Sequence, residues 1–372
     1  MGGKQKIAFV IGSLTSGGAE RVVTTLSRSL SHNYDVTIFT FQKGETVYRL
    51  DDSVKVISCM DEIPPSKTVL HSLILNYKLY RRLTSMLKSH QIELVIGFIT
   101  MANVLTILAA KTLKIPCIVS ERNNPYTDAT PRFWKLCRRL TYPYAGFLVV
   151  QTELIKDFYK DLIDPRKIGV LPNPISQDLT KNRKENQPKE NVVLNVGKLH
   201  DQKNQAFLIR AFHTLDFKDW KLIIIGEGER RKSLENLIVE LKLESNVFLL
   251  GRKNNIHDFY NRSKIFAFSS NYEGFPNALI EAMHFGLPCI STDCPTGPSE
   301  LIHDGDNGFL TPVGDMEQFG NKLQELMDNP ELRDKFSKKA MDTTSKFEVQ
   351  YVTVKWEKVI ESVLLPIEKT IT

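Results

Sequence analysis

Two glutamates on either side of a predicted helix start are the residues of this sequence best suited to ligand chemistry. Glu273 lies in a loop after a short apolar run, and Glu281 lies one turn inside a helix expected to begin near Pro276. The first backbone N–H groups of that helix, at residues 277–279, should lack intrahelical partners and carry the positive end of the helix dipole. They would bind an anion, while the carboxylates accept hydrogen bonds from hydroxyl groups beside it. A ligand with phosphate in the middle and hydroxyl-rich ends, such as a nucleotide sugar, fits this pattern.

The surrounding sequence distinguishes this pair of glutamates from a chance occurrence. Two glutamates eight residues apart recur in any acidic helical protein, where they are ordinary surface charges. Here Gly274 and Pro276 lie between them, and an apolar run at residues 264–268 precedes them. A strand, a loop with glycine and proline, and a helix in this order favour an anion-binding loop.

Length and composition indicate a globular protein of two domains. A chain of 372 residues is longer than one hydrophobic core usually supports, because a domain holds roughly 100 to 200 residues. The hydrophobic and charged fractions, 42% and 25%, are those of ordinary soluble domains. The net charge of +6 suits an anionic substrate or a membrane surface. Without a recognised module, this moderate charge argues against nucleic-acid binding.

The cysteines and the hydropathy of the sequence indicate the cellular compartment of the protein. The cysteines, at positions 59, 117, 137, 289 and 294, form an odd set without C-x-x-C spacing. This set favours a reducing compartment over disulfides or a zinc site. No apolar run approaches the ~20 residues that a membrane-spanning helix needs. The sequence therefore predicts a cytoplasmic protein.

The beginning of the chain has a second pattern suited to phosphate. An apolar run at residues 7–12 predicts a strand, Gly17 and Gly18 follow in a loop, and residues 19–30 have the period of an amphipathic helix. A glycine turn between strand and helix lets the backbone approach a phosphate closely. The spacing is not G-x-G-x-x-G, and no acidic residue ends the second predicted strand, so a nicotinamide cofactor is disfavoured.

Predicted strands and helices alternate through both halves of the chain. The other apolar runs that predict strands are residues 36–41, 54–57, 94–98, 117–119, 147–150, 192–196, 222–225, 246–250, 265–269 and 289–292. This alternation predicts an α/β protein with doubly wound parallel sheets, whose ligands bind at the carboxyl ends of the strands. A polar, charged stretch separates the halves. The expected division is residues 1–172, a linker at 173–190, residues 191–350 and a C-terminal helix at 351–372.

Two segments of the first half are basic and apolar together. Residues 69–88 place Leu73, Tyr77, Tyr80, Leu83 and Leu87 near one helical stripe, and Lys78, Arg81, Arg82 and Lys88 elsewhere. Residues 131–144 mix four basic residues with Phe133, Trp134, Tyr142 and Tyr144. One interpretation is a core-facing helix with a solvated basic face. The other is a surface that binds anionic lipid or a lipid-linked pyrophosphate.

Five motifs taken together resemble those of a known enzyme family. In chain order they are S-G-G-A-E-R, N-V-G-K-L-H-D-Q-K-N, G-E-G-E-R-R, E-G-F-P-N-A-L-I-E and D-G-D-N-G-F-L, and they extend over nearly the whole chain. The set is similar to that of the retaining glycosyltransferases of family 4. The resemblance implies the GT-B fold, with two Rossmann-like domains facing across a cleft and a C-terminal helix returning to the N-terminal domain. The N-terminal domain would bind the acceptor and the C-terminal domain the nucleotide sugar.

The resemblance also implies roles for individual residues. Glu273 would hold sugar hydroxyls of the donor, Glu281 the ribose hydroxyls, and the amides of residues 277–279 the pyrophosphate. Lys198 and Lys203 fall where the family keeps a basic pair on the pyrophosphate, although surface charges after a strand are the alternative. The implied donor-binding residues are Gly17, Gly18, Lys198, Lys203, Glu273, Gly274, Phe275, Pro276, Asn277, Ala278, Leu279 and Glu281. Of these, Lys198, Lys203 and Glu273 would be catalytic.

The mechanism that the resemblance implies needs neither a metal nor a cofactor. As the nucleoside diphosphate departs, Lys198, Lys203 and the helix end would stabilise the charge on the leaving phosphate. The acceptor hydroxyl would enter on the same face of the sugar and pass its proton to that phosphate. The chain departs from the family at Arg122, where many members carry His. Because Arg122 cannot act as a base near neutral pH, its role would be electrostatic.

Within the family, three stretches point to one group of enzymes. S-G-G-A-E-R, S-E-R-N-N and R-R-L-T-Y-P are most similar to bacterial enzymes that build glycans on polyprenyl pyrophosphate, N-acetylgalactosaminyltransferases among them. The implied partners are a nucleotide sugar, a lipid-linked glycan acceptor and an anionic membrane surface. The protein would lie on the inner face of the bacterial plasma membrane. The residues implied for the acceptor or its lipid pyrophosphate are Glu121, Arg122, Lys78, Arg81 and Arg82.

Other functions stay open at this point. A nucleotide-sugar epimerase on the same scaffold would convert its substrate without any acceptor, and it would not need the basic and apolar helices. A family 4 transferase could act instead on another acceptor, such as lipopolysaccharide core. A non-catalytic protein that binds nucleotides or nucleic acid is disfavoured by the moderate charge.

Overall fold

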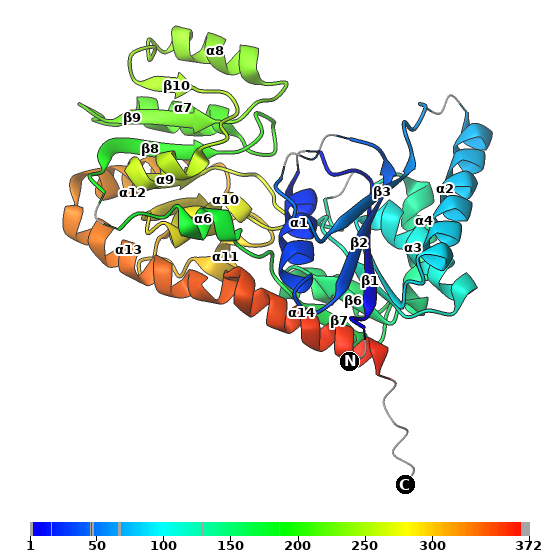
Figure 1. Cartoon of the computed structure of the whole chain (residues 1–372). Coiled ribbons are helices and arrows are strands. Elements are labelled where there is room, and N and C mark those ends of the chain that lie inside the picture. Colours follow the sequence, from blue (N-terminus) through cyan, green and yellow to red (C-terminus); the bar gives the residue numbers. More distant parts are fainter. Residues whose placement is uncertain are drawn as a thin grey trace. The chain divides into compact units, whose positions relative to one another are not determined.

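The computed structural model divides into two compact units (Figure 1). It describes residues 3–15, 17–44, 46, 48–65, 68–127, 130–185 and 187–365. Unit 1 consists of Met1–Ser176 together with Val349–Thr372, and unit 2 of Gln177–Glu348. The last helix of the chain therefore belongs to the same unit as the N-terminus, as the family resemblance implies.

Unit 1 is built on a sheet of seven parallel strands in the order β3-β2-β1-β4-β5-β6-β7. The strands are β1 (Lys6–Ile11), β2 (Asp35–Gln42), β3 (Lys55–Met60), β4 (Leu94–Phe98), β5 (Cys117–Ser120), β6 (Phe147–Val150) and β7 (Ile168–Val170). Its helices are α1 (Gly18–Leu30), α2 (Val69–Ser89), α3 (Thr100–Leu113), α4 (Arg132–Thr141), α5 (Glu153–Tyr159) and α14 (Val349–Leu364). Short 3₁₀ turns lie at Tyr142–Tyr144 and Pro165–Lys167. The predicted helix end at residues 366–372 lies outside the described residues.

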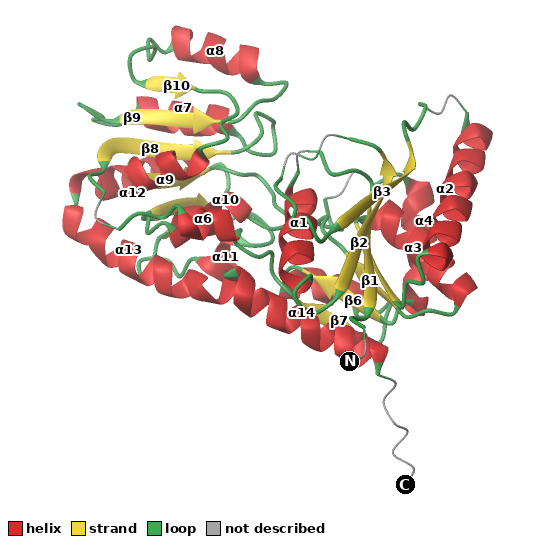
Figure 2. Cartoon of the chain, viewed as in Figure 1, coloured by secondary structure: helices red, strands yellow, loops and turns green. Residues whose placement is uncertain are grey.

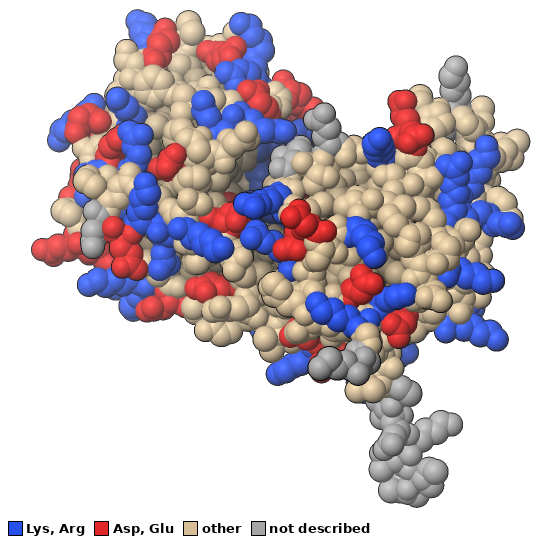
Figure 3. Space-filling model, in the orientation of Figure 1, with Lys and Arg blue, Asp and Glu red and all other residues tan. Residues whose placement is uncertain are grey.

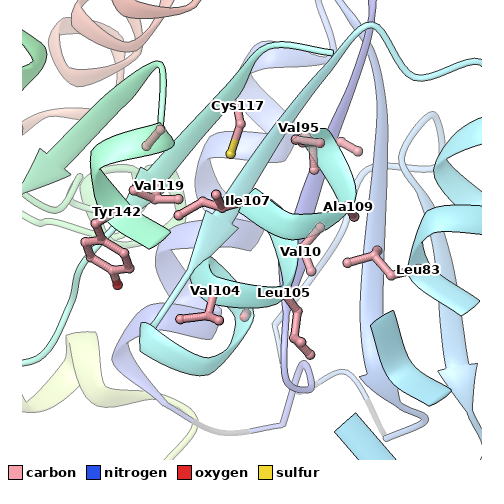
Figure 4. Close-up of a cluster of buried hydrophobic side chains, with 14 of the residues drawn as sticks. Val10, Leu83, Val95, Val104, Leu105, Ile107, Ala109, Cys117, Val119 and Tyr142 are labelled. Carbon is pink, nitrogen blue, oxygen red and sulfur yellow. The ribbon is translucent and has the colours of Figure 1, made fainter. Parts of the chain in front are cut away.

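Helices cover both faces of the unit 1 sheet. Alternate residues of a strand point to opposite faces, so Ala8 and Val10 join one core cluster while Ile7, Phe9 and Ile11 join the other. The first cluster, shown in Figure 4, is closed by α2, α3 and α5. The second is closed by α1 and α14. Burial on both faces explains why β1 is a continuous apolar run rather than an alternating one.

Unit 2 repeats this plan on a sheet of six parallel strands in the order β10-β9-β8-β11-β12-β13 (Figure 2). The strands are β8 (Glu190–Val196), β9 (Lys221–Ile225), β10 (Val247–Leu249), β11 (Ser263–Phe268), β12 (Cys289–Thr292) and β13 (Phe309–Thr311). The helices are α6 (Gln177–Lys181), α7 (Gln205–His213), α8 (Arg231–Glu240), α9 (Ile256–Arg262), α10 (Asn277–His284), α11 (Pro298–Leu301), α12 (Met316–Asp328) and α13 (Pro330–Thr344). A 3₁₀ turn at Ser345–Phe347 follows α13.

Of the polar stretch expected as a linker, residues 173–190, the part from residue 177 onward belongs to unit 2 and makes hydrogen bonds within it. The Thr180 hydroxyl lies 3.1 Å from Nε2 of His284, and Arg183 donates to the backbone carbonyl of His284 at 3.1 Å. The amide of Lys184 donates to the side chain of Asn261 at 2.9 Å. Polar side chains in this stretch therefore bind to backbone and side-chain groups of unit 2.

Among the described residues, none of the helices combines the length and the apolar character needed to cross a membrane.

The packing of α14 predicts a large loss of stability when its central tryptophan is truncated. Trp356 is fully buried, and its ring stacks on that of Phe98 with centroids 5.9 Å apart. Trp356→Ala would leave a cavity, so we expect the free energy of unfolding of unit 1 to fall by about 3–5 kcal/mol. Urea unfolding followed by circular dichroism measures this. Val354→Ala, at an exposed position of the same helix, is the control and should change stability by less than about 0.5 kcal/mol. Equal effects of the two substitutions would contradict this packing.

Candidate functional site

The strand order places the candidate residues of unit 2 where a doubly wound sheet binds ligands. From β8 the chain proceeds outward to β9 and β10 on one side, while β11, β12 and β13 extend on the other. The carboxyl ends of β8 and β11 therefore flank the point where the strand order reverses, which is the usual ligand site of such sheets. The loop at residues 197–204 follows β8, and the loop at residues 269–276 follows β11.

Hydrogen bonds fasten these two loops to each other. The amide of Asn271 donates to the carbonyl of Gln202 at 2.8 Å, and the Ser269 hydroxyl donates to the carbonyl of Lys203 at 2.8 Å. The side chains of Asn204 and Asn271 are joined at 3.0 Å. Asn204 has a φ of 47°, a left-handed conformation that asparagine tolerates better than most residues. The two loops consequently form one braced structure.

A buried ion pair lies at the centre of this braced structure. Nζ of Lys203 is 2.5 Å from Oε1 of Glu273, and the two side chains are only 21% and 5% exposed. Nε2 of Gln202 lies 3.5 Å from the other carboxylate oxygen, and Nζ of Lys203 also lies 5.2 Å from the centre of the Phe268 ring. The structure therefore brings together Lys203 and Glu273, two of the three residues expected to be catalytic.

Lys198 lies in the same loop but differs in environment. Its side chain is exposed to solvent, while its backbone carbonyl accepts a hydrogen bond from Gln205 at 3.1 Å. An exposed lysine next to the pair of Lys203 and Glu273 keeps its ammonium group available to an incoming anion.

The start of α10 differs from the sequence expectation. Residues 277–279 were expected to have amides without local partners, but Asn277 donates to the carbonyl of Phe275 at 2.9 Å and Leu279 to that of Pro276 at 3.0 Å. The expectation is therefore wrong for these two amides. The reason is local, because Pro276 has φ −84° and ψ 68°, close to an inverse γ-turn, and the helix then opens with a tight i to i+3 bond. Ala278 lies between them, half-buried.

Glu281 is buried one turn inside α10. The hydroxyl of Tyr260 donates to its carboxylate at 3.1 Å. Tyr260 lies in α9 and is fully buried. Sequence reasoning did not find this tyrosine, because it lies 21 residues from Glu281 and belongs to none of the recognised motifs.

A strained turn after β12 supports the loop that carries Glu273. Thr296 has a φ of 68°, unusual for a β-branched residue, and its hydroxyl donates to the backbone carbonyl of Glu273. Gly297 has a φ of 109°, and a Cβ there would collide with the ring of Pro276. Gly274 lies half-buried between these contacts. The turn-rich sequence at residues 295–298 was the only signal for this support.

Phe275, also predicted to bind the donor, packs within unit 2. Its ring makes an edge-to-face contact with that of Phe347, with centroids 6.2 Å apart. This contact anchors the loop before α10 from its other side.

In unit 1, Gly17 and Gly18 lie at the start of α1, after β1. The strand order reverses between β1 and β4, so this loop also lies at a switch point. The carbonyl of Gly17 accepts hydrogen bonds from the amide of Arg21 at 3.2 Å and from the hydroxyl of Tyr48 at 3.1 Å. A Cβ at Gly17 would collide with the carboxylate of Glu20, and burial raises the pKa of Glu20. Ser16 lies outside the described residues.

Glu121 is a structural carboxylate in this structure. It has no exposed surface, and its oxygens accept from the Thr100 hydroxyl at 2.9 Å, the Tyr142 hydroxyl at 2.7 Å and the amide of Arg122 at 3.1 Å. Burial raises the pKa of Tyr142 well above its usual range, and the charge of Glu121 raises it further. The side chain of Glu121 therefore has no accessible surface with which to contact an acceptor.

Arg122 is buried beside this carboxylate. Its guanidinium carbon lies 5.0 Å from the centre of the Phe98 ring and 5.9 Å from that of Trp356, and Nη1 donates to the side chain of Asn173 at 2.6 Å. Among the described residues, its Nε and Nη2 have no hydrogen-bond partner. Burial lowers the pKa of Arg122 to about 9, although the charge of Glu121 acts in the opposite direction.

The helix α2 carries two apolar stripes rather than the one predicted. Its core side consists of Leu75, Leu79, Leu83 and Leu87. The predicted stripe is therefore wrong for its first half, because Leu73 and Tyr77 are exposed together with Leu70 and Ile74. Lys78, Arg81 and Arg82 are also exposed, and Arg82 donates to the carbonyl of Cys59 at 2.6 Å. Figure 3 shows basic side chains gathered over α2 at the right-hand edge of the view.

The environment of Arg122 predicts that the fold does not need its charge. Burying a cation with two unpaired donors costs about 1–3 kcal/mol per orphaned group. We expect Arg122→Met to leave unit 1 no less stable, with a gain of about 1 kcal/mol at pH 7. Because the folded pKa is depressed, the cost is fully present below about pH 9 and is relieved as the pH rises above this value. The gain should therefore shrink between pH 7 and pH 10 in urea titrations. A loss of stability at pH 7 would show that the guanidinium is a net structural contact.

Both halves of the chain match models of glycosyltransferase families. Residues 16–179 match Glycosyltransferase Family 4, and residues 176–343 match Glycosyl transferases group 1.

Individual relatives cover almost the whole chain. A Campylobacter jejuni protein named GalNAc-alpha-(1->4)-GalNAc-alpha-(1->3)-diNAcBac-PP-undecaprenol alpha-1,4-N-acetyl-D-galactosaminyltransferase is 31% identical over 361 residues, which is 96% of this chain and 99% of that protein. A second protein of that organism, an N-acetylgalactosamine-N,N'-diacetylbacillosaminyl-diphospho-undecaprenol 4-alpha-N-acetylgalactosaminyltransferase, is 29% identical and covers 92% of this chain and 96% of its own length.

Among solved structures, Anabaena Alr3699/HepE in complex with UDP matches with a TM-score of 0.80 at 18% identity, over 96% of this chain and 100% of that one. The parallel sheets of both units agree with this likeness. On this fold, and on the 31% identity along nearly the full length of a relative, the chain belongs to glycosyltransferase family 4 and has the GT-B fold.

Proposed function

We propose that this chain is a retaining glycosyltransferase that moves a hexose or N-acetylhexosamine from a nucleotide sugar to a polyprenyl-pyrophosphate-linked oligosaccharide. Our choice of donor is UDP-GalNAc, with α linkage, in bacterial surface-glycan or N-glycan assembly. The observation that carries this proposal is the buried pair of Lys203 and Glu273 at the switch point of unit 2. The names of two relatives, which refer to undecaprenol-linked GalNAc transfer, support the acceptor.

The two buried carboxylates would hold the two hydroxyl-rich parts of the donor. A carboxylate accepts more hydrogen bonds than a single ammonium group supplies, so Glu273 can accept from sugar hydroxyls while Lys203 stays bound. Glu281 would accept from the ribose hydroxyls beside the Tyr260 hydroxyl. The amides of Asn277 and Ala278 would bind the pyrophosphate, while that of Leu279 stays bonded to the carbonyl of Pro276. The amide of Asn277 would give up its bent hydrogen bond to the carbonyl of Phe275 and donate instead, with straighter geometry, to a phosphate oxygen.

Bond cleavage would be assisted by positive charge at the diphosphate. As the bond from the anomeric carbon to the phosphate oxygen breaks, charge grows on that oxygen, and Lys198 and Lys203 would stabilise it. The acceptor hydroxyl would attack from the same face, form the new glycosidic bond and give its proton to the departing phosphate. None of these steps requires a protein base, a metal or a cofactor.

Among the residues of unit 1, Gly17 and Gly18 would bind the donor, and the others would act on the acceptor side. Gly17 and Gly18 would let the backbone approach phosphate at the start of α1, where the helix dipole is favourable. Arg122 would contribute positive charge, and Glu121 would hold the backbone that carries Arg122. Lys78, Arg81 and Arg82 would bind the lipid pyrophosphate or an anionic membrane surface. On this proposal the protein works at the inner face of the plasma membrane.

The role of Glu273 predicts a large loss of activity in an isosteric variant. Glu273→Gln keeps the volume of the side chain but removes the charge, so transfer should fall by about 10²–10³-fold in kcat. Glu281→Gln should instead mainly raise KM for the donor, because it acts on the ribose. The assay incubates the protein with a panel of nucleotide sugars and lipid-linked acceptors and weighs the products by mass spectrometry.

The exposed Glu244 supplies the matched control. Glu244→Gln should transfer at the parent rate, and circular dichroism should show that all variants are folded. Full activity of Glu273→Gln would remove this residue from the site. Conversion of the nucleotide sugar without any acceptor would replace the transferase by an epimerase.

The cationic face of α2 predicts weaker membrane binding on neutralisation. Lys78→Gln combined with Arg81→Gln removes two exposed charges, each worth about 1 kcal/mol near an anionic surface, so binding to phosphatidylglycerol vesicles should weaken about 30-fold. Co-sedimentation at low and high salt measures the effect. Neutralising Lys242 and Lys338, exposed lysines of unit 2, is the control for net charge. Equal weakening in both variants would contradict a specific role of α2.

A further inference from the structure

An apolar groove of about 560 Å³ lies on unit 1, over α3 and between α2 and α4. Two of its walls come from the basic and apolar segments at residues 69–88 and 131–144, and the proposed chemistry of sugar transfer does not use it. The lining side chains come from all three helices and include Tyr77, Tyr80, Leu108, Phe133, Trp134 and Cys137.

The walls of the groove present carbon rather than unsatisfied polar groups. The hydroxyls of Tyr80 and Thr112 bind each other at 2.8 Å, and the amide nitrogen of Asn76 donates to the carbonyl of Ser72 at 2.8 Å. Their polar atoms are thus satisfied within the protein. A peptide backbone laid in this groove would find few partners for its own N–H and C=O groups, whereas a hydrocarbon chain needs none.

The groove continues into an exposed apolar surface. On α2, Leu70, Leu73 and Ile74 precede the groove-lining Tyr77 and are all exposed. On α4, Leu136 and Leu140 are 57% and 62% exposed. Exposed apolar side chains that adjoin a pocket mark a binding surface rather than scattered surface residues.

The charge of the surrounding helices selects the kind of amphiphile. The sequences of α2, α3 and α4 contain nine Lys and Arg residues and no Asp or Glu. Lys111 lines the groove, and its Nζ lies 3.8 Å from the centre of the Tyr144 ring. Lys78 and Arg81 are exposed beside the groove-lining Tyr77 and Tyr80. The groove is apolar, and all the Lys, Arg, Asp and Glu residues of its three helices are Lys or Arg. Such a groove complements a hydrocarbon chain with an anionic head.

We propose that this groove binds the isoprenoid segment next to the phosphate of a polyprenyl-linked substrate, with the phosphate at the cationic rim formed by Lys111, Lys78 and Arg81. This inference rests on the proposed function, which supplies such a substrate. The groove then holds the lipid end of the acceptor in unit 1 by its hydrocarbon and not by charge alone. Each carbon removed from water strengthens binding by a factor of about four, so a few isoprene carbons matter as much as several surface charges.

Two natural reporters allow binding to be measured on the unmodified full chain. Of the three tryptophans, Trp220 and Trp356 are buried, and Trp134 lines the groove and is partly exposed. Of the five cysteines, all within the described residues, Cys137 is the one that is not buried, and it also lines the groove. A bound chain should change the fluorescence of Trp134 and slow the alkylation of Cys137.

The probes are geranylgeranyl monophosphate, geranylgeraniol without the phosphate, and inorganic pyrophosphate. We expect the monophosphate to protect Cys137 and to bind more tightly than the alcohol, and pyrophosphate alone to give no protection. Leu108→Glu, which places a carboxylate in the groove, should weaken binding of the monophosphate at least about tenfold. Leu154→Glu makes the same change at an exposed leucine of α5, outside the lining and outside the apolar surface that continues it, and should bind within about twofold of the parent chain.

Three results would overturn the inference. One is equal weakening in Leu108→Glu and Leu154→Glu, and another is absence of Cys137 protection by the monophosphate. The third is protection by phosphatidylglycerol vesicles as strong as that by the prenyl phosphate, which would assign the groove to bilayer lipid. Sugar transfer is assayed separately with the parent chain. Transfer without groove binding refutes this inference alone, whereas prenyl phosphate binding without any transfer refutes the proposed function.

Discussion

The ion pair between Lys203 and Glu273 is the interaction on which the organisation of unit 2 depends. Removing both charges from water is costly, and their attraction offsets this cost only when the geometry is fixed. The surrounding loops supply that geometry, because hydrogen bonds join them and the strained Thr296 holds the carbonyl of Glu273. A pair held in this way needs little rearrangement when an anion arrives. The ammonium group of Lys203 would then interact with both the diphosphate and Glu273. The carboxylate would keep lone pairs free to accept hydrogen bonds from sugar hydroxyls.

Both units are built on doubly wound parallel sheets, but they differ in how far the charged side chains at the switch point are buried. In unit 2 the charged pair lies at the switch point and is partly exposed. Lys198, in the same loop as Lys203, is exposed to solvent. In unit 1 the corresponding edge buries Glu121 completely and places Arg122 near two aromatic rings, one of which comes from α14. In unit 1 the positive charge that an external ligand can reach therefore lies on the helices α2, α3 and α4 rather than at the switch point. This division agrees with a compact anionic donor for one unit and an extended amphiphile for the other.

Much of this fold follows from the sequence because its strands are buried on both faces. Continuous apolar runs such as residues 7–11 have no other simple interpretation, and nearly every run of four or more residues is a strand. The strands β7 and β13 were not predicted, because Gly169 interrupts the first apolar run and the second directly follows the turn-rich sequence D-G-D-N-G. In the site, the glutamates were identifiable by their context. Tyr260 and Thr296 were not, because their contacts with Glu281 and Glu273 join residues more than twenty positions apart and belong to no shared pattern.

The helix α2 shows why sequence alone left two interpretations open. Apolar residues spaced three and four apart satisfy a helical period whichever face they occupy, so Leu73 and Tyr77 looked equivalent to Leu83 and Leu87. The neighbours decide between them, since α3 packs against one side of α2 and leaves the other uncovered. A helix with a core stripe and a second exposed stripe gains nothing in water from the second one. The absence of acidic residues from α2, α3 and α4 adds a second constraint, because an ordinary solvated surface mixes both signs of charge. Folding does not require apolar exposure and one sign of charge on the same three helices, whereas the proposed binding of an anionic amphiphile uses both.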